Sequence, residues 1–148
     1  MQAGFRRIAA GRMAGLTLLI FVATAAAAEW ENVGTDADGN VYSVDVSRMS
    51  RDAGTVSIVV RTEYATPRRI DGAETDVFVA LDQMVVDCGK VSFAVQSRTL
   101  VAADGTEMPR GSTARANLRF RAAAAGSMSE TIVRFACGSG ADGKQKVG

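Results

Sequence analysis

The sequence predicts an α+β fold: an antiparallel β-sheet of about six strands, with a C-terminal helix packed on one face. Three observations lead to this prediction. Stretches rich in β-branched residues alternate polar and apolar side chains with a period of two. Asp-Gly pairs, which favour tight turns, separate these stretches. Near the C-terminus, apolar residues recur at helical spacing after a helix-capping sequence.

The first two strands are expected to form a hairpin over residues 29–46. EWENV leads through the turn TDADGN into VYSVDV, and two alternating stretches around such a turn are typical of a hairpin. In the second arm the apolar face is predicted to hold Tyr42, Val44 and Val46, and the polar face Ser43 and Asp45.

The middle of the chain predicts two long strands. The turn RDAG leads into TVSIVVRTEY at 55–64, and a proline with an Asp-Gly pair predicts a loop over 64–74. The extended run that follows covers 75–88. Its interior Asp82 and Gln83 predict a bulge or a brief loss of pairing.

The next strand lies within 90–101, where Val91, Phe93 and Val95 are expected to point inward and the residues between them outward. AADGTEMP at 102–109 closes a further hairpin. Short turns between successive strands favour an antiparallel meander.

The last element is predicted to be a helix that starts at Ser127. Ser127 and Glu130 stand three residues apart, which is the spacing of a capping box, and Gly138 stands where a C-cap is expected. The alternative is a strand with Val133, Phe135 and Cys137 on one face.

The first 28 residues are interpreted as a cleaved signal peptide. Three arginines and no acid precede the apolar run at 16–28, which ends in small residues before Glu29. This run has 13 residues, whereas a spanning helix needs about 20. An uncleaved membrane anchor is the alternative. The remainder is expected to be one domain over 29–138 with a flexible tail at 139–148.

The charge of the exported part argues against nucleic acid as a partner. Removing three of the 17 basic residues while keeping all 16 acids leaves a net charge of −2. Nucleic-acid binders carry a basic excess. We therefore expect a periplasmic or secreted protein that meets the membrane only through its signal peptide during export.

The two cysteines, Cys88 and Cys137, are expected to form a disulfide. An even pair in a small exported domain is most often oxidised. The chain has no histidine, which leaves a zinc site short of ligands and a cysteine nucleophile without its usual base. One cysteine ends a predicted strand and the other ends the predicted helix, so the bond would tie the helix to the sheet.

No motif of the sequence predicts catalysis or a cofactor. DADGN at 36–40 does not fit a calcium loop, because its glycine falls at position four instead of six. The chain lacks a G-x-S-x-G elbow, a P-loop and a dinucleotide fingerprint. We therefore expect a protein that is not an enzyme and uses no cofactor or metal.

The most distinctive surface feature is the stretch RGSTARANLRFR at 110–121, in which four arginines occur without an acid. With two earlier arginines it could form a basic patch for an anionic partner. A flexible, solvated linker with Phe120 packed inward is the simpler interpretation. The candidate patch consists of Arg68, Arg69, Arg110, Arg115, Arg119 and Arg121.

The ordered landmarks of the chain resemble the bacterial surface-adhesin protein E family. They are Trp30, then GNVYSVDVSRM, a strand ending in Tyr64, a strand to Cys88, and GSMSETIVRFAC. The chain departs from the family at Phe120, where a tryptophan is expected. The resemblance implies an antiparallel sheet with a helix tethered by the Cys88–Cys137 bond, and it implies surface adhesion more weakly.

Two functions follow as hypotheses. The first is a non-enzymatic binding module that engages an unknown protein or envelope component. The second is a periplasmic carrier of a small ligand between sheet and helix, which would need an enclosed apolar pocket with a few polar groups.

Overall fold

The structure is a computed structural model that describes residues 27–70, 72–73 and 75–138. The predicted tail, and all but the last two residues of the predicted signal peptide, lie outside this range. The strands are β1 (Trp30–Thr35), β2 (Val41–Asp45), β3 (Ser50–Asp52), β4 (Thr55–Arg68), β5 (Val77–Asp87), β6 (Ser92–Ala102), β7 (Glu107–Ser112) and β8 (Arg121–Ala122). The helices are α1 (Met128–Gly138) and the 3-10 turns η1 (Val46–Arg48) and η2 (Arg115–Asn117).

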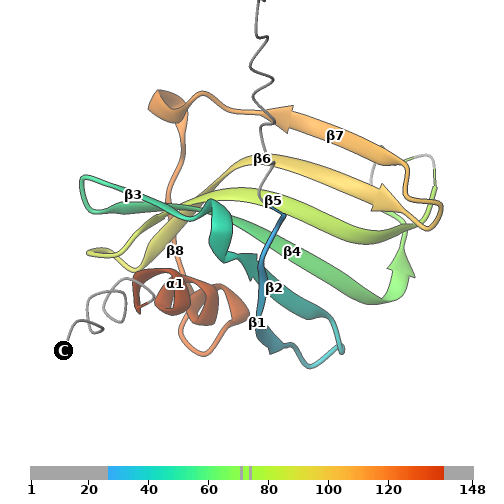
Figure 1. Cartoon of the computed structure of the whole chain (residues 1–148), viewed down its shortest axis with the longest axis horizontal. Helices are drawn as coiled ribbons and strands as arrows, with labels where there is room; N and C mark the ends of the chain where they lie inside the picture. Colours follow the sequence, from blue (N-terminus) through green and yellow to red (C-terminus); the bar gives the residue numbers. More distant parts are fainter. Residues whose placement is uncertain (1–26, 71, 74, 139–148) are drawn as a thin grey trace, which may run out of the picture.

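The strands form one antiparallel sheet in the order β1-β2-β4-β5-β6-β7, with the short β3 paired to β4 and the short β8 paired to β6 (Figure 1). Strands that follow one another in the chain are neighbours in this order, apart from the short β3 and β8. The predicted meander of about six main strands with a C-terminal helix is confirmed.

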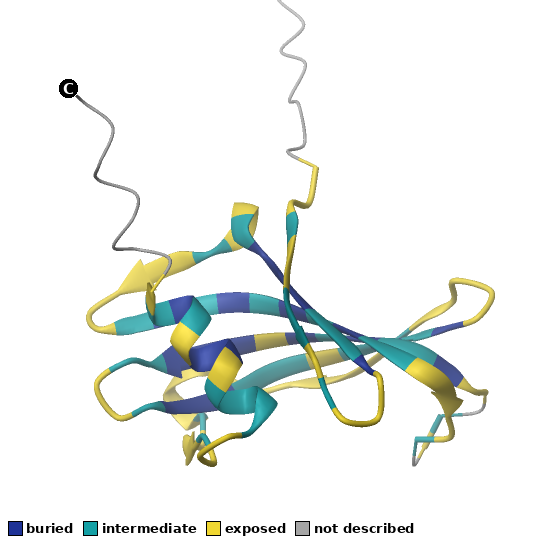
Figure 2. Ribbon diagram, turned by 90° about the horizontal axis from the view of Figure 1, so that it is seen from below, coloured by how far each residue is buried: buried dark blue, intermediate teal, exposed yellow. Residues whose placement is uncertain are grey.

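The core lies between the sheet and α1, which crosses one face (Figure 2). Val56, Ile58 and Val60 alternate along β4 and are each at most 2% exposed. From the helix, Ile132, Val133 and Ala136 pack into the same cluster. Burying a valine or isoleucine side chain contributes about 1.5–3 kcal/mol, so this contact fixes the helix on the sheet. A smaller cluster of Val77, Ala80 and Leu100 lies farther along the sheet.

The predicted loop over 64–74 is wrong in its first part, because β4 continues to Arg68. The pairing of β4 with β5 is interrupted between Glu63 and Arg68. Pro67 lies within this interruption, so its missing N–H costs no bond of the ladder.

The bulge predicted at Asp82 and Gln83 is placed in the wrong strand, because the register of β5 against β6 shifts between Gln83 and Met84 but the extra residue is Gln96 of β6. The predicted alternation in β6 holds only in part. Ser92 and Ala94, expected to point outward, are 6% and 2% exposed. β8 pairs with Ser92 and covers the edge of β6 at this point.

The predicted one-sided burial of β2 is also incomplete. Ser43 and Asp45, expected on the polar face, are 9% and 0% exposed, and Val46 starts η1 instead of extending the strand. Asp45 caps η1, and its carboxylate accepts hydrogen bonds from Ser47 Oγ at 2.6 Å and Arg48 Nε at 2.6 Å. These bonds compensate the burial of the charge.

The C-terminal helix is confirmed, and the alternative strand is wrong. Ser127 Oγ accepts a hydrogen bond from the Glu130 N–H at 3.2 Å, and Glu130 Oε2 accepts one from the Gly126 N–H at 2.7 Å. The capping pair therefore satisfies two backbone donors at the start of α1.

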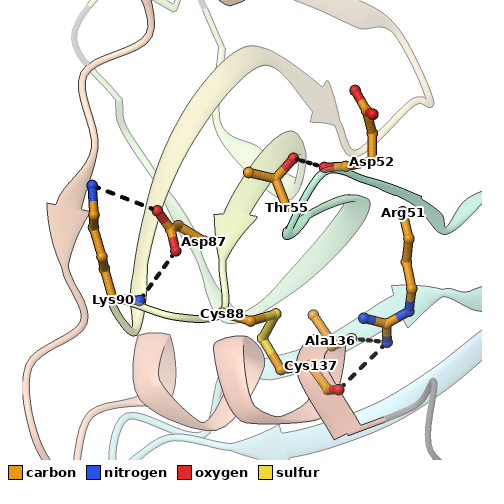
Figure 3. The surroundings of a disulfide bond; sticks show 8 residues. All are labelled: Arg51, Asp52, Thr55, Asp87, Cys88, Lys90, Ala136 and Cys137. Carbon is orange, nitrogen blue, oxygen red and sulfur yellow. Dashed lines mark hydrogen bonds and ion pairs between the residues drawn. A yellow bond between two sulfur atoms is a disulfide. The ribbon is translucent and has the colours of Figure 1, made fainter.

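The predicted disulfide joins Cys88, just after β5, to Cys137 in α1, with the two Cα atoms 5.7 Å apart (Figure 3). Arg51 of β3 adds a second tie, because its Nη2 donates to the Ala136 carbonyl at 2.8 Å. This cation satisfies one of the carbonyls left free at a helix C-terminus. The end of α1 is thus held at two points.

Candidate functional site

The structure separates Arg115 from the rest of the predicted basic patch. Its guanidinium donates to Thr55 Oγ1 at 2.9 Å and to Ser57 Oγ at 3.1 Å. Val56 and Ile58 of the same strand lie in the core under α1. Because neighbouring residues of a strand point to opposite faces, Arg115 lies on the face away from the helix.

Arg68 and Arg69 lie beside carboxylates. Arg68 stacks over the Tyr64 ring, 5.1 Å from its centroid, and lies 3.4 Å from the Asp38 carboxylate. Arg69 lies 3.4 Å from the Asp76 carboxylate. These neighbouring carboxylates therefore partly compensate the positive charges of Arg68 and Arg69.

The structure brings the other three arginines together. Arg110, Arg119 and Arg121 line one pocket of about 410 Å³, with Ala94 and Val95 in its wall. A fourth arginine, Arg98 of β6, also lines it. We call the space between these four side chains the arginine pocket.

A gap in the pairing of the sheet edge creates this pocket. β7 pairs with the second half of β6 from Ser97 onward, and β8 pairs with Ser92 and Phe93 at its start. Between these two pairings the chain leaves the edge, and the Thr113 N–H donates to the Gln96 carbonyl at 2.8 Å. Arginines from both sides of the gap therefore converge on it.

The charges around the pocket are unequally balanced. Asp82 accepts from Arg98 Nε at 2.6 Å and from Nη2 at 2.7 Å, and these bonds raise the pKa of Arg98. Arg121 stacks on the Phe93 ring, 4.6 Å from its centroid. Within the described part of the chain, neither Arg119 nor Arg121 has a carboxylate within 4.0 Å.

The expectation that Phe120 packs inward is wrong, since 43% of this residue is exposed. Arg121 occupies the place over Phe93, and an extended chain turns the preceding side chain the other way. An exposed aromatic ring therefore stands between the two arginines that lack acidic partners.

A second cavity adjoins the arginine pocket and shares Val95, Arg98 and Arg121 with it. It has a volume of about 260 Å³ and lies between the β1–β2 turn, the sheet and the start of α1. We call it the polar cavity. Its lining includes Asp36, Asn40, Tyr42, Thr62, Tyr64, Asp82 and Ser129.

Hydrogen bonds fix the polar side of this cavity. The Tyr42 hydroxyl donates to Asp36 Oδ2 at 2.9 Å, and burial together with this bond raises the pKa of Tyr42 to about 12. Asp36 also accepts from the Asn40 side chain at 2.9 Å, which holds the pKa of Asp36 below its usual value. The cavity is thus polar, whereas the carrier hypothesis expects an apolar pocket.

No cluster of three or more metal-binding side chains was found among the described residues. Both cysteines belong to the disulfide. In the same part of the chain, no helix is long and apolar enough to cross a membrane.

The chain matches the model of one protein family. An antiparallel meander with a disulfide-tethered C-terminal helix defines a small α+β protein. The family model of surface-adhesin protein E matches residues 30–138, so the chain belongs to the surface-adhesin protein E family. A search of curated proteins and of solved structures found no match.

The arginine pocket was predictable from the sequence only in part. The run of arginines at 110–121 indicated three of its members. Arg98 gave no such signal, because its neighbours in sequence belong to an ordinary strand. Its role depends on the cross-strand pairing with Asp82, which the register of β5 against β6 determines.

Proposed function

We propose that the chain is an exported, non-enzymatic binding module of the bacterial cell envelope, working as one domain over residues 29–138. Membership of a family of surface adhesins supports a binding role. The observation that carries the proposal is the arginine pocket, where three members of the predicted patch meet Arg98. Its partner would present anionic groups, and the mildly acidic remainder of the surface would keep other polyanions away.

The test is binding of the purified exported protein to isolated envelopes of its own cell. We expect binding that weakens as salt rises, since exposed charges are screened within about 8 Å at physiological ionic strength. The double variant Arg119→Ser with Arg121→Ser should lose it. Arg115→Ser removes one positive charge from the same segment on the other face, so it is the control for position, and it should bind as the parent does.

Equal binding of the double variant and the control would contradict the proposal. Melting temperatures of all variants belong in the experiment, because Arg115 and Arg121 both make contacts within the fold. A loss of binding counts only where the variant keeps the melting temperature of the parent within a few degrees.

A carrier of a small ligand is the second candidate, supported by the polar cavity beside α1. The polar lining would suit a hydroxylated ligand better than an apolar one. Native mass spectrometry of protein purified from its own cells tests this function. A small molecule that stays bound to the parent but not to the double variant Tyr42→Phe with Thr62→Val would support the carrier function. Protein without a bound molecule in repeated preparations would contradict it.

A further inference from the structure

The arginine pocket offers positive charge in a concave setting. The described residues that line it include four arginines and no acid. Asp82 compensates Arg98, whereas Arg119 and Arg121 have no described carboxylate within 4.0 Å. Two positive charges therefore remain for a ligand at this open, concave part of the surface.

Two of the arginines are held in place before any ligand arrives. Both oxygens of Asp82 fix Arg98. Arg121 is held by stacking on Phe93, which uses the face of the guanidinium and leaves its N–H donors at the rim. A site whose donors are already oriented loses less conformational entropy on binding.

We propose that the arginine pocket binds the phosphate monoester group of an envelope molecule or a soluble metabolite. This inference rests on the proposed function and names the chemical class of its ligand. The planar forks of guanidinium groups match phosphate oxygens in pairs, and each such bond is charge-assisted. A phosphate monoester carries close to two negative charges at pH 7, which matches Arg119 and Arg121, whereas a single carboxylate would leave one of them unpaired.

The size of the pocket indicates that the phosphate is one end of a larger molecule. Small-molecule sites span about 300–1,000 Å³, and the arginine pocket has about 410 Å³. The exposed Phe120 ring and the adjoining polar cavity offer surfaces for the remainder. The phosphate could belong to a lipid headgroup or to a soluble ester, and the experiment below separates these sources.

Calorimetric titration of the oxidised protein with glycerol 3-phosphate tests the inference, with lactate as the singly charged comparison. We expect the phosphate ester to bind more tightly, with an affinity that falls as salt rises. Arg119→Ser should weaken it at least about tenfold, the effect of losing one charge-assisted bond. Arg119 is exposed and makes no hydrogen bond or ion pair within the described part of the chain, so this variant should leave the packing intact.

Two further variants make the test specific. Arg119→Lys keeps the charge but loses the fork, so its affinity should fall between those of the parent and Arg119→Ser. Arg115→Ser should bind as the parent does, because Arg115 lies on the other face. Equal affinity in Arg119→Ser and Arg115→Ser, or no binding of the ester by the parent, would overturn the inference.

Vesicles distinguish the two sources of phosphate. Phosphatidylcholine vesicles containing phosphatidic acid present a monoester, and matched vesicles containing phosphatidylglycerol present only a diester. Preference for phosphatidic acid would assign the site to a membrane lipid. Binding of glycerol 3-phosphate without vesicle binding would assign it to a soluble ester.

The inference and the proposed function can fail separately. If no phosphate monoester binds but the double variant still loses envelope binding, the proposed binding function is supported and its ligand is a different anionic group. If Arg119→Ser weakens binding of the ester while the double variant binds envelopes as the parent does, the phosphate site is supported and the proposed envelope contact is wrong.

Discussion

Asp45 shows why single residues of this fold matter more than the sequence pattern indicates. The alternation in β2 places it on the polar face, yet it is 0% exposed. Burial alone would raise the pKa of Asp45, but hydrogen bonds from Ser47 and Arg48 outweigh it and hold the pKa below its usual value. The carboxylate is therefore charged and fully partnered, which is how a buried charge is tolerated.

Asp45→Asn should lower the free energy of unfolding at pH 7 by about 2 kcal/mol, because a bond to a charged group contributes about 1.5–3 kcal/mol. A carboxyl whose pKa is lowered by folding stabilises above its unfolded pKa of about 3.9 and loses this effect as the pH falls through its folded pKa. Urea unfolding between pH 7 and pH 2 should thus show a shallower acid decline in the variant. Asp52→Asn, at an exposed acid, should behave as the parent, and identical declines in all three proteins would contradict this account.

The Asp45 carboxylate also contacts the backbone at the predicted cleavage site. The Glu29 N–H donates to Asp45 Oδ1 at 3.2 Å, and the Val46 N–H donates to the Glu29 carbonyl at 2.9 Å. Cleavage after Ala28 would turn that amide into an ammonium group beside a buried carboxylate. The new ion pair would strengthen the attachment of β1 to η1.

A protein that begins at Glu29 should therefore be more stable than its N-acetylated form, by about 1 kcal/mol at pH 6. The difference exists while the amine is protonated, and it should fade as the pH rises through the titration of the amine in the folded protein. Thermal melts at pH 6 and pH 10 measure it. An equal difference at both pH values, or one that persists in Asp45→Asn, would show that Asp45 is not the partner.

At the scale of elements, the sequence predicted the long strands and missed the short ones. β4 and β6 contain enough alternating residues for a period of two to be visible, and β5 is a long, mostly apolar run. β3 and β8 have three and two residues, too few for any pattern. They form because β4 and β6 offer unpaired edges, which is a property of the assembled sheet.

The end of a helix was predictable where a side chain hydrogen-bonds to the backbone of a residue close by in sequence. The capping pair Ser127 and Glu130 lies within four residues of sequence, so its pattern could be read directly. Arg51 caps the other end of α1 from 85 residues away, and no local pattern could indicate it.

The disulfide between α1 and the sheet should contribute measurably to stability. Closing a loop across 49 positions contributes about 4 kcal/mol in the chain-entropy estimate. Replacing both Cys88 and Cys137 with Ala should lower the free energy of unfolding by about this amount. Amide exchange in α1 should rise more than in β4 and β5, since the sheet keeps its own ladder.

Peptide mapping without reductant checks the bond itself, and it should recover the peptides of Cys88 and Cys137 joined. Two free thiols in the exported protein would contradict the tether. Equal increases of exchange in α1 and in the central strands would show that the bond stabilises the whole sheet and does not specifically hold the helix.

At the scale of the whole molecule, the fold turns a run of arginines into distinct surfaces. Arg115 crosses to the face away from α1, whereas Arg119 and Arg121 return to the sheet edge beside Arg98. The sequence could indicate their charge but could not show which of them meet, because that depends on the path of the chain after β7. The resemblance to the family implied the sheet and the tethered helix, but it did not indicate this surface.

Photo-crosslinking in the native envelope shows directly whether the arginine pocket contacts a partner. Phe120 is replaced with a photoreactive phenylalanine analogue, which conserves an exposed ring between Arg119 and Arg121. Leu81 carries the same analogue as the control, since it lines a hollow of the sheet beside Arg48 and away from the arginine pocket. We expect a crosslinked envelope component at position 120 that is lost at high salt, and little crosslinking at position 81. Equal crosslinking at both positions, or none at position 120, would contradict it.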